Sequence, residues 1–417
     1  MRKASVSIQG RAARLTRTRH GDRDRNLPLL NLHDAGVAVV AGSAVYWLES
    51  GISAFFGYRR VPGLRSVDRL PDASLPTLAI VATAKDEAAS VEGAARSLLA
   101  QDYPGLSLVI VDDRSMDGTG AILNQLAVED PRLHVVHIDS LPYGWVGKCH
   151  ALARGAEATD SEWILFVDAD VTLAPDAARR AVSLARRDGW DHVAVGPDMR
   201  LESLGEEIFV AAFMVVFDTS QRPWRASNPR RRNAIGIGAF NLVRRENYRR
   251  AGGHEALRYE LIDDMALGKI LKQKGGARQT FARHDGLVSV HWHPGIRGLI
   301  HGVEKNAFPG LRYNVPLGLI APWLLLVVSW APAFGFLLGS PLASVLSLCA
   351  WCGVLLCYRE VERSVNIKAW HAVTMPVGVT LFLYAFVRSM ALTLIRGGVV
   401  WRGTFYPLEE LKRGRVW

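Results

Sequence analysis

Cysteine is scarce in this sequence, with four residues in 417, and three of the four stand in one apolar run. So few cysteines exclude a disulfide scaffold. The spacing of Cys349 and Cys352 suits a metal site, but no histidine or second cysteine pair stands near them, so we expect small buried thiols. Disorder is also excluded, because 49% of the residues are hydrophobic and only 22% are charged.

Charge is absent from a long stretch near the C-terminus, since residues 313–358 contain no Asp, Glu, Lys or Arg. A bilayer core takes about 20 apolar residues per helix, so this stretch fits two crossings with a turn at Gly339-Ser340-Pro341. A third apolar stretch, residues 372–387, is followed by Arg388. We therefore expect two or three transmembrane helices within residues 313–395, and hence a multi-pass protein of the cell membrane.

The N-terminal residues combine a basic tail with an apolar segment. Residues 1–35 begin with eight Lys and Arg among the first 25 positions, and residues 36–58 are apolar except for Glu49. The apolar segment either crosses the membrane or lies in its interface, and no signal-peptide cleavage site follows a short apolar core. We expect the basic tail to lie near anionic lipid headgroups, without nucleic-acid binding, because no recognition module is present. Residues 396–417 would form a C-terminal tail.

Between the two ends, residues 66–303 alternate short apolar runs with helical patterns. The runs, which read as buried strands, are Thr77–Ala84, Leu106–Val111, Leu133–Ile138 and Trp163–Val167. The helical patterns between and after them are Glu87–Ala100, Gly118–Ala127, Gly147–Ala158 and Pro175–Arg187. This alternation predicts an α/β domain with a mostly parallel sheet covered by helices on both faces.

Acidic side chains follow the ends of three of these runs. They are Glu87, the pair Asp112-Asp113 and the pair Asp168 and Asp170. Ligands of such sheets bind beyond the carboxyl ends of the strands. Residues two apart on an extended segment point to the same face, so Asp168 and Asp170 can share one hard cation, Mg²⁺ or Mn²⁺. Adjacent buried carboxylates are costly unless a ligand or a partner binds them.

Together these segments resemble an inverting family 2 glycosyltransferase with a GT-A fold, a Rossmann-like mostly parallel sheet domain. The resemblance covers roughly residues 75–276 and is carried by Thr83-Ala84-Lys85-Asp86-Glu87, Ser97-Leu98-Leu99-Ala100-Gln101-Asp102-Tyr103-Pro104, Val111-Asp112-Asp113-Arg114-Ser115-Met116-Asp117-Gly118-Thr119 and Phe166-Val167-Asp168-Ala169-Asp170. A further segment, Tyr143-Gly144-Trp145-Val146-Gly147-Lys148, resembles the hopanoid-associated and carotenoid-type membrane branch of that family.

The resemblance implies roles for individual residues. It places Glu87, Asp112, Asp113, Lys148 and Asp168 at the donor nucleotide. Asp170 would be the direct metal ligand, with Asp168 beside it. The segment Leu261-Ile262-Asp263-Asp264 resembles the catalytic acidic segment of the family. Asp264 would then be the general base that inverting transfer to a hydroxyl requires, and Asp263 stands where the family usually has Glu.

One family element is missing. Many membrane members carry a Gln/Arg-x-x-Arg-Trp element after the base, and this sequence has none. His293 and Arg297 occupy roughly its place, so we expect them to contact the diphosphate or the acceptor. Two features stay open: the apolar segment Ile208–Phe217 packs in the core or forms a lipid-acceptor wall, and the glycines of Gly236-Ile237-Gly238 serve a sugar or an ordinary turn.

The function implied by the resemblance is a membrane-bound, metal-dependent hexosyltransferase. It would move a sugar from a nucleotide diphosphate, a UDP-sugar first of all, to a hydroxyl or carboxyl of a hopanoid, carotenoid or other polyisoprenoid, with its catalytic domain in the cytoplasm. Alternative acceptors are a sphingolipid, a diacylglycerol or a growing polysaccharide. A nucleotidyltransferase is disfavoured because no Gly-rich phosphate loop follows the first strand. A non-catalytic scaffold is disfavoured because every acidic position named above is retained.

Overall fold

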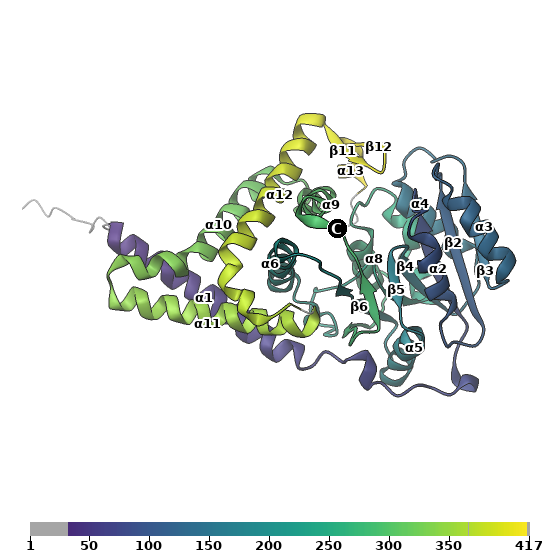
Figure 1. The fold of residues 1–417 in the computed structure, drawn as a ribbon, viewed down its shortest axis with the longest axis horizontal. Coiled ribbons are helices and arrows are strands. Elements are labelled where there is room, and N and C mark those ends of the chain that lie inside the picture. The colour runs from purple at the N-terminus through teal and green to yellow at the C-terminus, as the bar shows by residue number, and fades with distance from the viewer. Residues whose placement is uncertain (1–31, 366, 415–417) are drawn as a thin grey trace, which may run out of the picture.

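The computed structural model describes residues 32–365 and 367–414, and its chain forms an α/β domain with an arm of long helices on one side (Figure 1). The basic segment predicted at the N-terminus falls outside the described residues up to position 31.

The domain is built on a seven-stranded sheet in the order β3-β2-β1-β4-β8-β6-β9. Its strands are β1 (Leu78–Ala84), β2 (Leu106–Asp113), β3 (Leu133–Ile138), β4 (Trp163–Asp168), β6 (His192–Gly196), β8 (Asn241–Arg244) and β9 (Gln279–Arg283). Strands β3, β2, β1 and β4 are parallel, β8 is antiparallel to both β4 and β6, and β6 is parallel to β9. The four predicted runs are the parallel half, which confirms the predicted fold class.

Helices cover both faces of this sheet. One face packs against α2 (Val91–Leu99), α3 (Thr119–Glu129) and α5 (Ala177–Asp188), and the other against α4 (Gly147–Glu157), α7 (Arg245–Ala251) and α8 (Asp263–Gln273). In β1, Ile80 belongs to the first core and Val81 to the second, and neither is exposed. Burial on both faces explains why the strand sequences are continuously apolar.

A smaller sheet, β5-β10-β7, extends the sheet edge next to the acidic turn after β4. Its strands are β5 (Val171–Leu173), β7 (Asp198–Met199) and β10 (Val288–Val290).

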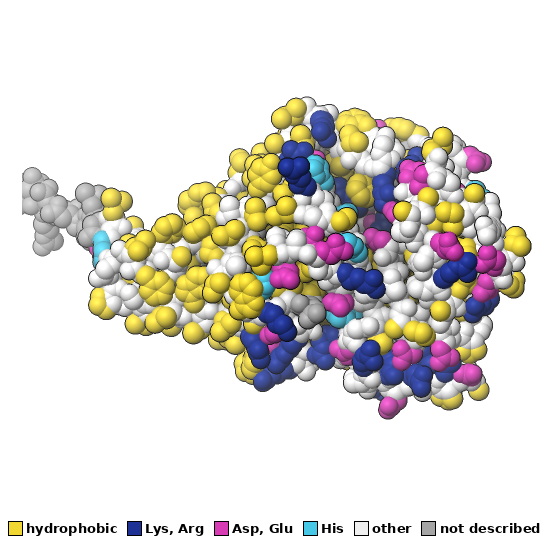
Figure 2. All heavy atoms as spheres, viewed as in Figure 1, with side chains coloured by type: hydrophobic (Ala, Val, Ile, Leu, Met, Phe, Trp, Pro, Cys, Tyr) yellow, Lys and Arg dark blue, Asp and Glu magenta, His cyan; other side chains and the backbone are white. Residues whose placement is uncertain are grey.

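Within the described residues, four helices are long and apolar enough to cross a membrane, one near the N-terminus and three near the C-terminus. They are α1 (Leu32–Tyr58), α10 (Val315–Phe334, extended to Leu338), α11 (Pro341–Ser364) and α12 (Met375–Arg396, preceded by a turn from Ala369). Figure 2 shows hydrophobic side chains over the arm that these helices form and charged side chains over the α/β domain. The predicted turn is confirmed, because Gly339 ends the α10 segment and Ser340 caps α11.

The arm is held together by close contacts between α1 and its neighbours. A Cβ on Gly51 would lie 2.4 Å from the carbonyl oxygen of Gly353 in α11, so glycine is required for the two backbones to approach this closely. Ser43 and Trp47 both donate hydrogen bonds to the carbonyl of Val328 in α10. The apolar segment at residues 36–58 is therefore part of a packed helix bundle.

Charged residues within the apolar helices have partners. Glu49 of α1 forms a bidentate ion pair with Arg222, and Arg388 of α12 pairs with Glu304 at 2.9 Å. This neutralisation allows α12 to continue past Arg388, where the sequence had indicated a break. Cys352 is exposed on α11, so the prediction that it is buried was wrong; Cys357 is buried as expected.

Two helices connect the arm to the sheet. They are α6 (Leu204–Gln221) and α9 (Gly295–Gly310), and both contact α12 (Figure 1). After α12 the chain returns to the α/β domain as a hairpin, β11 (Gly398–Trp401) and β12 (Thr404–Pro407), and a short helix, α13 (Leu408–Arg413). The predicted C-terminal tail is therefore an ordered part of the structure up to Gly414.

Candidate active site

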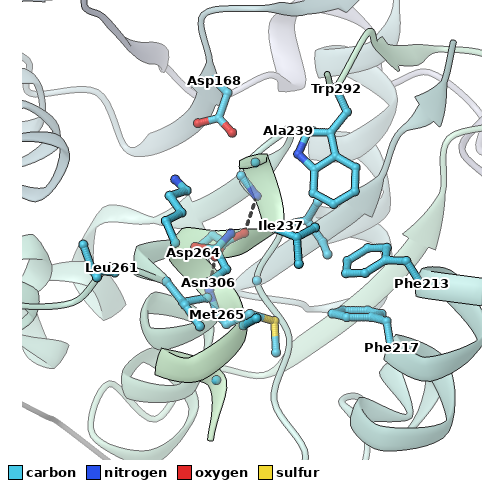
Figure 3. Close-up of a pocket in the computed structure, with 18 of the residues that line it drawn as sticks. Asp168, Phe213, Phe217, Ile237, Ala239, Leu261, Asp264, Met265, Trp292 and Asn306 are labelled. Atoms are coloured by element: carbon cyan, nitrogen blue, oxygen red, sulfur yellow. Dashed lines mark hydrogen bonds between the residues drawn. The ribbon is translucent and has the colours of Figure 1, made fainter. Parts of the chain in front are cut away.

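A cavity of about 1020 Å³ lies where the carboxyl ends of β1 and β4 face α8, α9 and the membrane helices. This volume is at the upper end of the range for small-molecule sites, about 300–1,000 Å³. One side of the cavity is lined by charged side chains of both signs, and the other side is apolar. Figure 3 shows Asp168 and Asp264 on the first side, with Phe213, Phe217 and Trp292 on the second.

The charged side centres on Lys148, the second residue of α4. Its Nζ lies 2.7 Å from Asp168 at the end of β4 and 3.3 Å from Asp263 at the start of α8. Burial acts to lower the pKa of Lys148, but the negative charges of Asp168, Asp263 and Asp264 outweigh it and raise that pKa well above its ordinary value. Lys148 is therefore a cation that joins three chain segments.

Asp264 is held by backbone groups rather than by a cation. Its Oδ2 accepts a hydrogen bond from the backbone N–H of Gly238 at 2.8 Å, and its Oδ1 accepts one from Met265 at 2.7 Å. The same Gly238 accepts a hydrogen bond from the backbone N–H of Asp168. A Cβ on Gly238 would lie 2.4 Å from the Asp168 carboxylate, so only glycine permits this link between the two acids.

The surroundings of Asp264 change its proton affinity. Burial, followed by the charge of neighbouring Asp263, raises the pKa of Asp264 to about 6. Each carboxylate oxygen has two lone pairs, so the hydrogen bonds from Gly238 and Met265 leave acceptor capacity free. A half-buried carboxylate with a pKa slightly below neutrality suits a general base.

Asp170 differs from its neighbour Asp168. Its exposed carboxylate lines the cavity and forms no hydrogen bond or ion pair with another residue among residues 32–365 and 367–414. Partial desolvation inside the cavity, together with the charge of Asp168, raises the pKa of Asp170 to about 7. A raised carboxylate pKa indicates a position that a bound cation would stabilise.

The two carboxylates after β4 fit a divalent cation. No group of three or more His, Cys, Asp or Glu side chains that could hold a metal occurs within the described chain. Mg²⁺ and Mn²⁺ suit such a site, because Mg²⁺ commonly takes one or two carboxylates and completes its coordination with phosphates and water. Asp170 has the free oxygens for this, whereas an oxygen of Asp168 already faces Lys148.

The predicted nucleotide residues divide into two groups. Glu87 and Asp113 line the cavity, and Asp113 forms a bidentate pair with Arg114, at 2.7 and 2.9 Å. Asp112 is not part of the cavity wall. Its buried carboxylate accepts a hydrogen bond from the backbone of Ser115 and lies 3.1 Å from a ring nitrogen of His137. The structure therefore does not bring Asp112 to the cavity, where it was predicted to bind the nucleotide.

The two predicted substitutes for the missing family element also separate. His293 lines the cavity, and burial, followed by the charges of Lys305 and Arg402, lowers its pKa to about 4, so it is neutral at pH 7. Arg297 lies exposed on α9 outside the cavity wall. The structure thus places only one of the pair at the candidate site.

Several polar residues of the cavity wall were not predicted from the sequence, among them Lys305, Asn306 and Arg402. Lys305 and Asn306 come from α9, and Arg402 comes from the turn of the C-terminal hairpin. The buried Oδ1 of Asn306 has no hydrogen-bond partner within the described residues. In the sequence, Lys305 and Asn306 are marked only by their place directly after Glu304, next to an apolar stretch.

The apolar side of the cavity is built from the connecting and membrane helices. Helix α6 has two faces: Phe209 and Val215 are buried in a core with α11 and α12, while Phe213 and Phe217 line the cavity. The segment Ile208–Phe217 therefore packs in the core on one face, as one interpretation predicted, and lines the cavity on the other; a contact of that second face with a lipid acceptor stays a prediction. The wall is completed by Trp292 together with Ala321, Leu324, Leu325 and Val328 of α10 and Phe382, Leu383 and Phe386 of α12.

The acidic cluster lies at the carboxyl edge of the parallel sheet, where ligands of such sheets bind, next to helices long and apolar enough to cross a membrane. Residues 79–252 match the family described as Glycosyl transferase family 2. These residues form a family 2 glycosyltransferase domain, as the sequence motifs predicted.

Known proteins similar to this chain include glycosyltransferases of Staphylococcus aureus. One, a 4,4'-diaponeurosporenoate glycosyltransferase, is 22% identical over 355 residues, which cover 80% of this chain and 89% of the relative. The same enzyme of another strain is 23% identical over 354 residues, with the same coverage. Among solved structures, a mannosyltransferase from Pyrobaculum calidifontis in complex with GDP-Man and Mn2+ is 20% identical, with a TM-score of 0.49 over 85% of this chain and 99% of the other.

Proposed function

We propose that this protein transfers a sugar, with inversion, from a nucleotide diphosphate donor to the polar end of a long apolar lipid. A UDP-sugar is the proposed donor and a carotenoid-type acid or another polyisoprenoid is the proposed acceptor. One observation carries the proposal: a single cavity connects the carboxylate and lysine cluster beyond the parallel strands to apolar walls made by membrane helices.

The donor would occupy the charged side. Glu87 and Asp113 lie where the nucleoside would bind at the ends of β1 and β2, and Asp170, with Asp168, would hold Mg²⁺ or Mn²⁺. When bound, the metal supplies positive charge that stabilises the diphosphate leaving group. Lys148 keeps Asp168 and Asp263 together, and thereby fixes β4 relative to α8.

Asp264 would act as the base. In the transfer, the acceptor oxygen forms a bond to the anomeric carbon while the bond to the donor phosphate breaks. The electron pair of that bond leaves with the nucleoside diphosphate, and the proton of a hydroxyl acceptor passes to a carboxylate oxygen of Asp264. The backbone hydrogen bonds from Gly238 and Met265 fix the orientation of this carboxylate before the acceptor arrives.

The acceptor assignment rests on two features. The relatives that align over most of this chain are named for a carotenoid carboxylate, diaponeurosporenoate. The apolar wall formed by α6, α10 and α12 offers a long lipid a route from the bilayer to Asp264. Arg59, Arg60 and Arg359 flank the domain ends of α1 and α11, whereas eight Lys and Arg precede the opposite end of α1 in the sequence, so the positive-inside rule favours neither orientation. The cytoplasmic placement of the catalytic domain stays a prediction.

A direct test is transfer by the purified full-length protein in lipid vesicles. The assay would combine UDP-glucose and Mn²⁺ with a C30 carotenoid acid or a polyisoprenol, and mass spectrometry would detect the glycosylated lipid. Formation of the product supports the proposal. Binding of UDP without transfer to any long apolar acceptor, while a soluble sugar is glycosylated, would contradict the lipid assignment.

The route of the lipid gives a sharper prediction. Leu325→Trp adds bulk to the apolar wall, so it is expected to reduce transfer to a long lipid about tenfold or more while UDP affinity is unchanged. The matched control is Leu319→Trp, because Leu319 lies on the same helix, is 59% exposed and does not line the cavity. Equal activity of the two variants in the vesicle assay would show that the lipid enters elsewhere.

The pKa of Asp264 predicts the pH dependence. The base must be ionised, and its pKa is about 6, so transfer to a hydroxyl acceptor should be constant above pH 7 and fall about tenfold per pH unit below pH 6. Rates measured at saturating Mn²⁺ keep the titration of Asp170 from contributing, because bound metal holds that carboxylate ionised. A flat profile from pH 5 to pH 8 would assign the base role to another group.

A further inference from the structure

The C-terminal hairpin β11–β12 lies across the donor side of the cavity, although the sequence places it more than 300 residues from β1. Arg402, in its turn, forms an ion pair with Glu87 and donates a hydrogen bond to the carbonyl of Lys85 at 2.8 Å. At the base of the hairpin, the hydroxyl of Tyr406 accepts a hydrogen bond from the backbone N–H of Gly147 at 3.1 Å. The hairpin thus bridges the end of β1 and the start of α4, the two segments that surround the proposed donor.

A second cation, Lys305, lies beside the hairpin. The ammonium of Lys305, on α9, lies 3.7 Å from the centre of the Trp401 ring. Trp401 is the residue directly before Arg402 in the chain. Within residues 32–365 and 367–414, Lys305 forms no ion pair. Burial, followed by the charge of Lys148, lowers the pKa of Lys305 to about 8, so it is still mostly charged at pH 7. A charged group without a carboxylate partner in a half-buried wall suits an anionic ligand.

The turn itself has an uncommon residue choice. Arg402 and Gly403 connect β11 and β12, and both have positive φ, +47° and +76°. This two-residue turn favours Asn, Asp or Gly at its first position, because a larger side chain is strained there. A side chain of 41% exposure gains little from an ion pair with Glu87. The arginine is therefore better explained by a ligand that it contacts than by hairpin stability.

The cations of the cavity are not equivalent. Lys148 is occupied by Asp168 and Asp263, whereas the only charged partner of Arg402 within the described chain is Glu87, a residue proposed to bind the nucleoside. When the nucleoside binds the Glu87 carboxylate, the guanidinium of Arg402 becomes available to the group of the ligand that follows the ribose. In a nucleotide donor that group is the diphosphate, which a planar guanidinium can bind through two hydrogen bonds.

We propose that Arg402 and Lys305 bind the diphosphate of the nucleotide donor, and that the hairpin is a strap whose arginine moves from Glu87 to the phosphates when the donor binds. This inference rests on the proposed function. It assigns the role of the missing Gln/Arg-x-x-Arg-Trp element to Arg402, which comes after the last membrane helix, and to Lys305 of α9, in place of His293 and Arg297.

The test compares UDP with UMP, because the two differ only in the second phosphate. Calorimetric titrations of the full-length protein in detergent with Mn²⁺ are expected to show UDP affinity reduced about 10- to 100-fold in Arg402→Ala and in Lys305→Met. UMP affinity should change less than threefold, and Arg402→Lys should recover part of the loss. The control is Lys412→Ala, which removes one positive charge from an exposed pair on α13 and should change neither affinity.

Three results would contradict either the role of Arg402 and Lys305 or the proposed donor. Unchanged UDP affinity in both Arg402→Ala and Lys305→Met would overturn the inference. Equal losses for UDP and UMP would overturn it too, because they would assign Arg402 to positioning Glu87 and the nucleoside. Failure of the unsubstituted protein to bind UDP would instead contradict the proposed donor, so the two failures can be told apart.

Discussion

The Asp264→Asn variant is expected to bind UDP with nearly unchanged affinity and to lose about 10²- to 10⁴-fold in transfer to a hydroxyl-bearing lipid. The loss follows from the removal of the only group proposed to accept the proton, while Glu87, Asp113 and Asp170 remain for the donor. Single-turnover transfer rates and UDP titrations would separate the two effects. The control is Asp139→Asn, an exposed position beyond the end of β3 with the same change of charge.

Asn cannot reproduce both backbone contacts of Asp264. The carboxylate accepts hydrogen bonds from Gly238 and Met265, and an amide has one oxygen, so its NH₂ group would face one of these donors. A backbone N–H left unpaired in a half-buried site costs about 1–3 kcal/mol. Thermal unfolding of the variant, together with Asp264→Glu, which keeps the charge, would show whether the lost rate reflects chemistry or a displaced loop.

The size of the loss also reports the acceptor group. A carboxylic acid acceptor is already ionised near pH 7 and needs no base, so Asp264→Asn should then cost less than about tenfold. A hydroxyl keeps its proton until the transition state, so its transfer needs the base. Full activity of Asp264→Asn with both kinds of acceptor would contradict the role of Asp264 altogether.

The parallel half of the sheet could be predicted because its strands are buried on both faces. Continuous apolar runs such as Leu106–Val111 and Trp163–Val167 are followed by acidic residues, which mark where each strand ends. Which acid faces the cavity could not be read in the same way. Asp112 and Asp113 are adjacent on β2, so the pleat points them to opposite faces, and only Asp113 reaches the cavity. The alternation of side chains along a strand predicts that Asp112 and Asp113 face opposite sides of the sheet, but it does not say which side holds the cavity.

The donor-side cations could not be predicted, because they depend on contacts between distant segments. Arg402 meets Glu87 across 315 positions of the chain, and its turn follows a membrane helix that carried no signal for a return to the α/β domain. The interruption predicted at Arg388 was wrong for a related reason, since its partner Glu304 lies on another helix. Local patterns predict elements and their ends, whereas the pairing of charges between elements requires the tertiary fold.

The Asp170→Asn variant is expected to lose the increase in UDP affinity that Mn²⁺ gives, and with it most of the transfer activity. Asp170 is the carboxylate that no other described residue engages, whereas Asp168 already pairs with Lys148. Replacing residues that only support a metal ligand costs about 10- to 100-fold in metal affinity, so loss of the ligand itself should cost at least that much.

UDP titrations with Mn²⁺ and with EDTA would measure this effect. The unsubstituted protein should bind UDP more tightly with Mn²⁺, and Asp170→Asn should bind equally weakly in both conditions. Asp160→Asn, a fully exposed position before β4, is the matched control. If Asp170→Asn kept the Mn²⁺-dependent increase, the metal would be held by Asp168 or by another group. Lys148 would then have to release Asp168 on donor binding, because its ammonium lies where a cation bound to that oxygen would be.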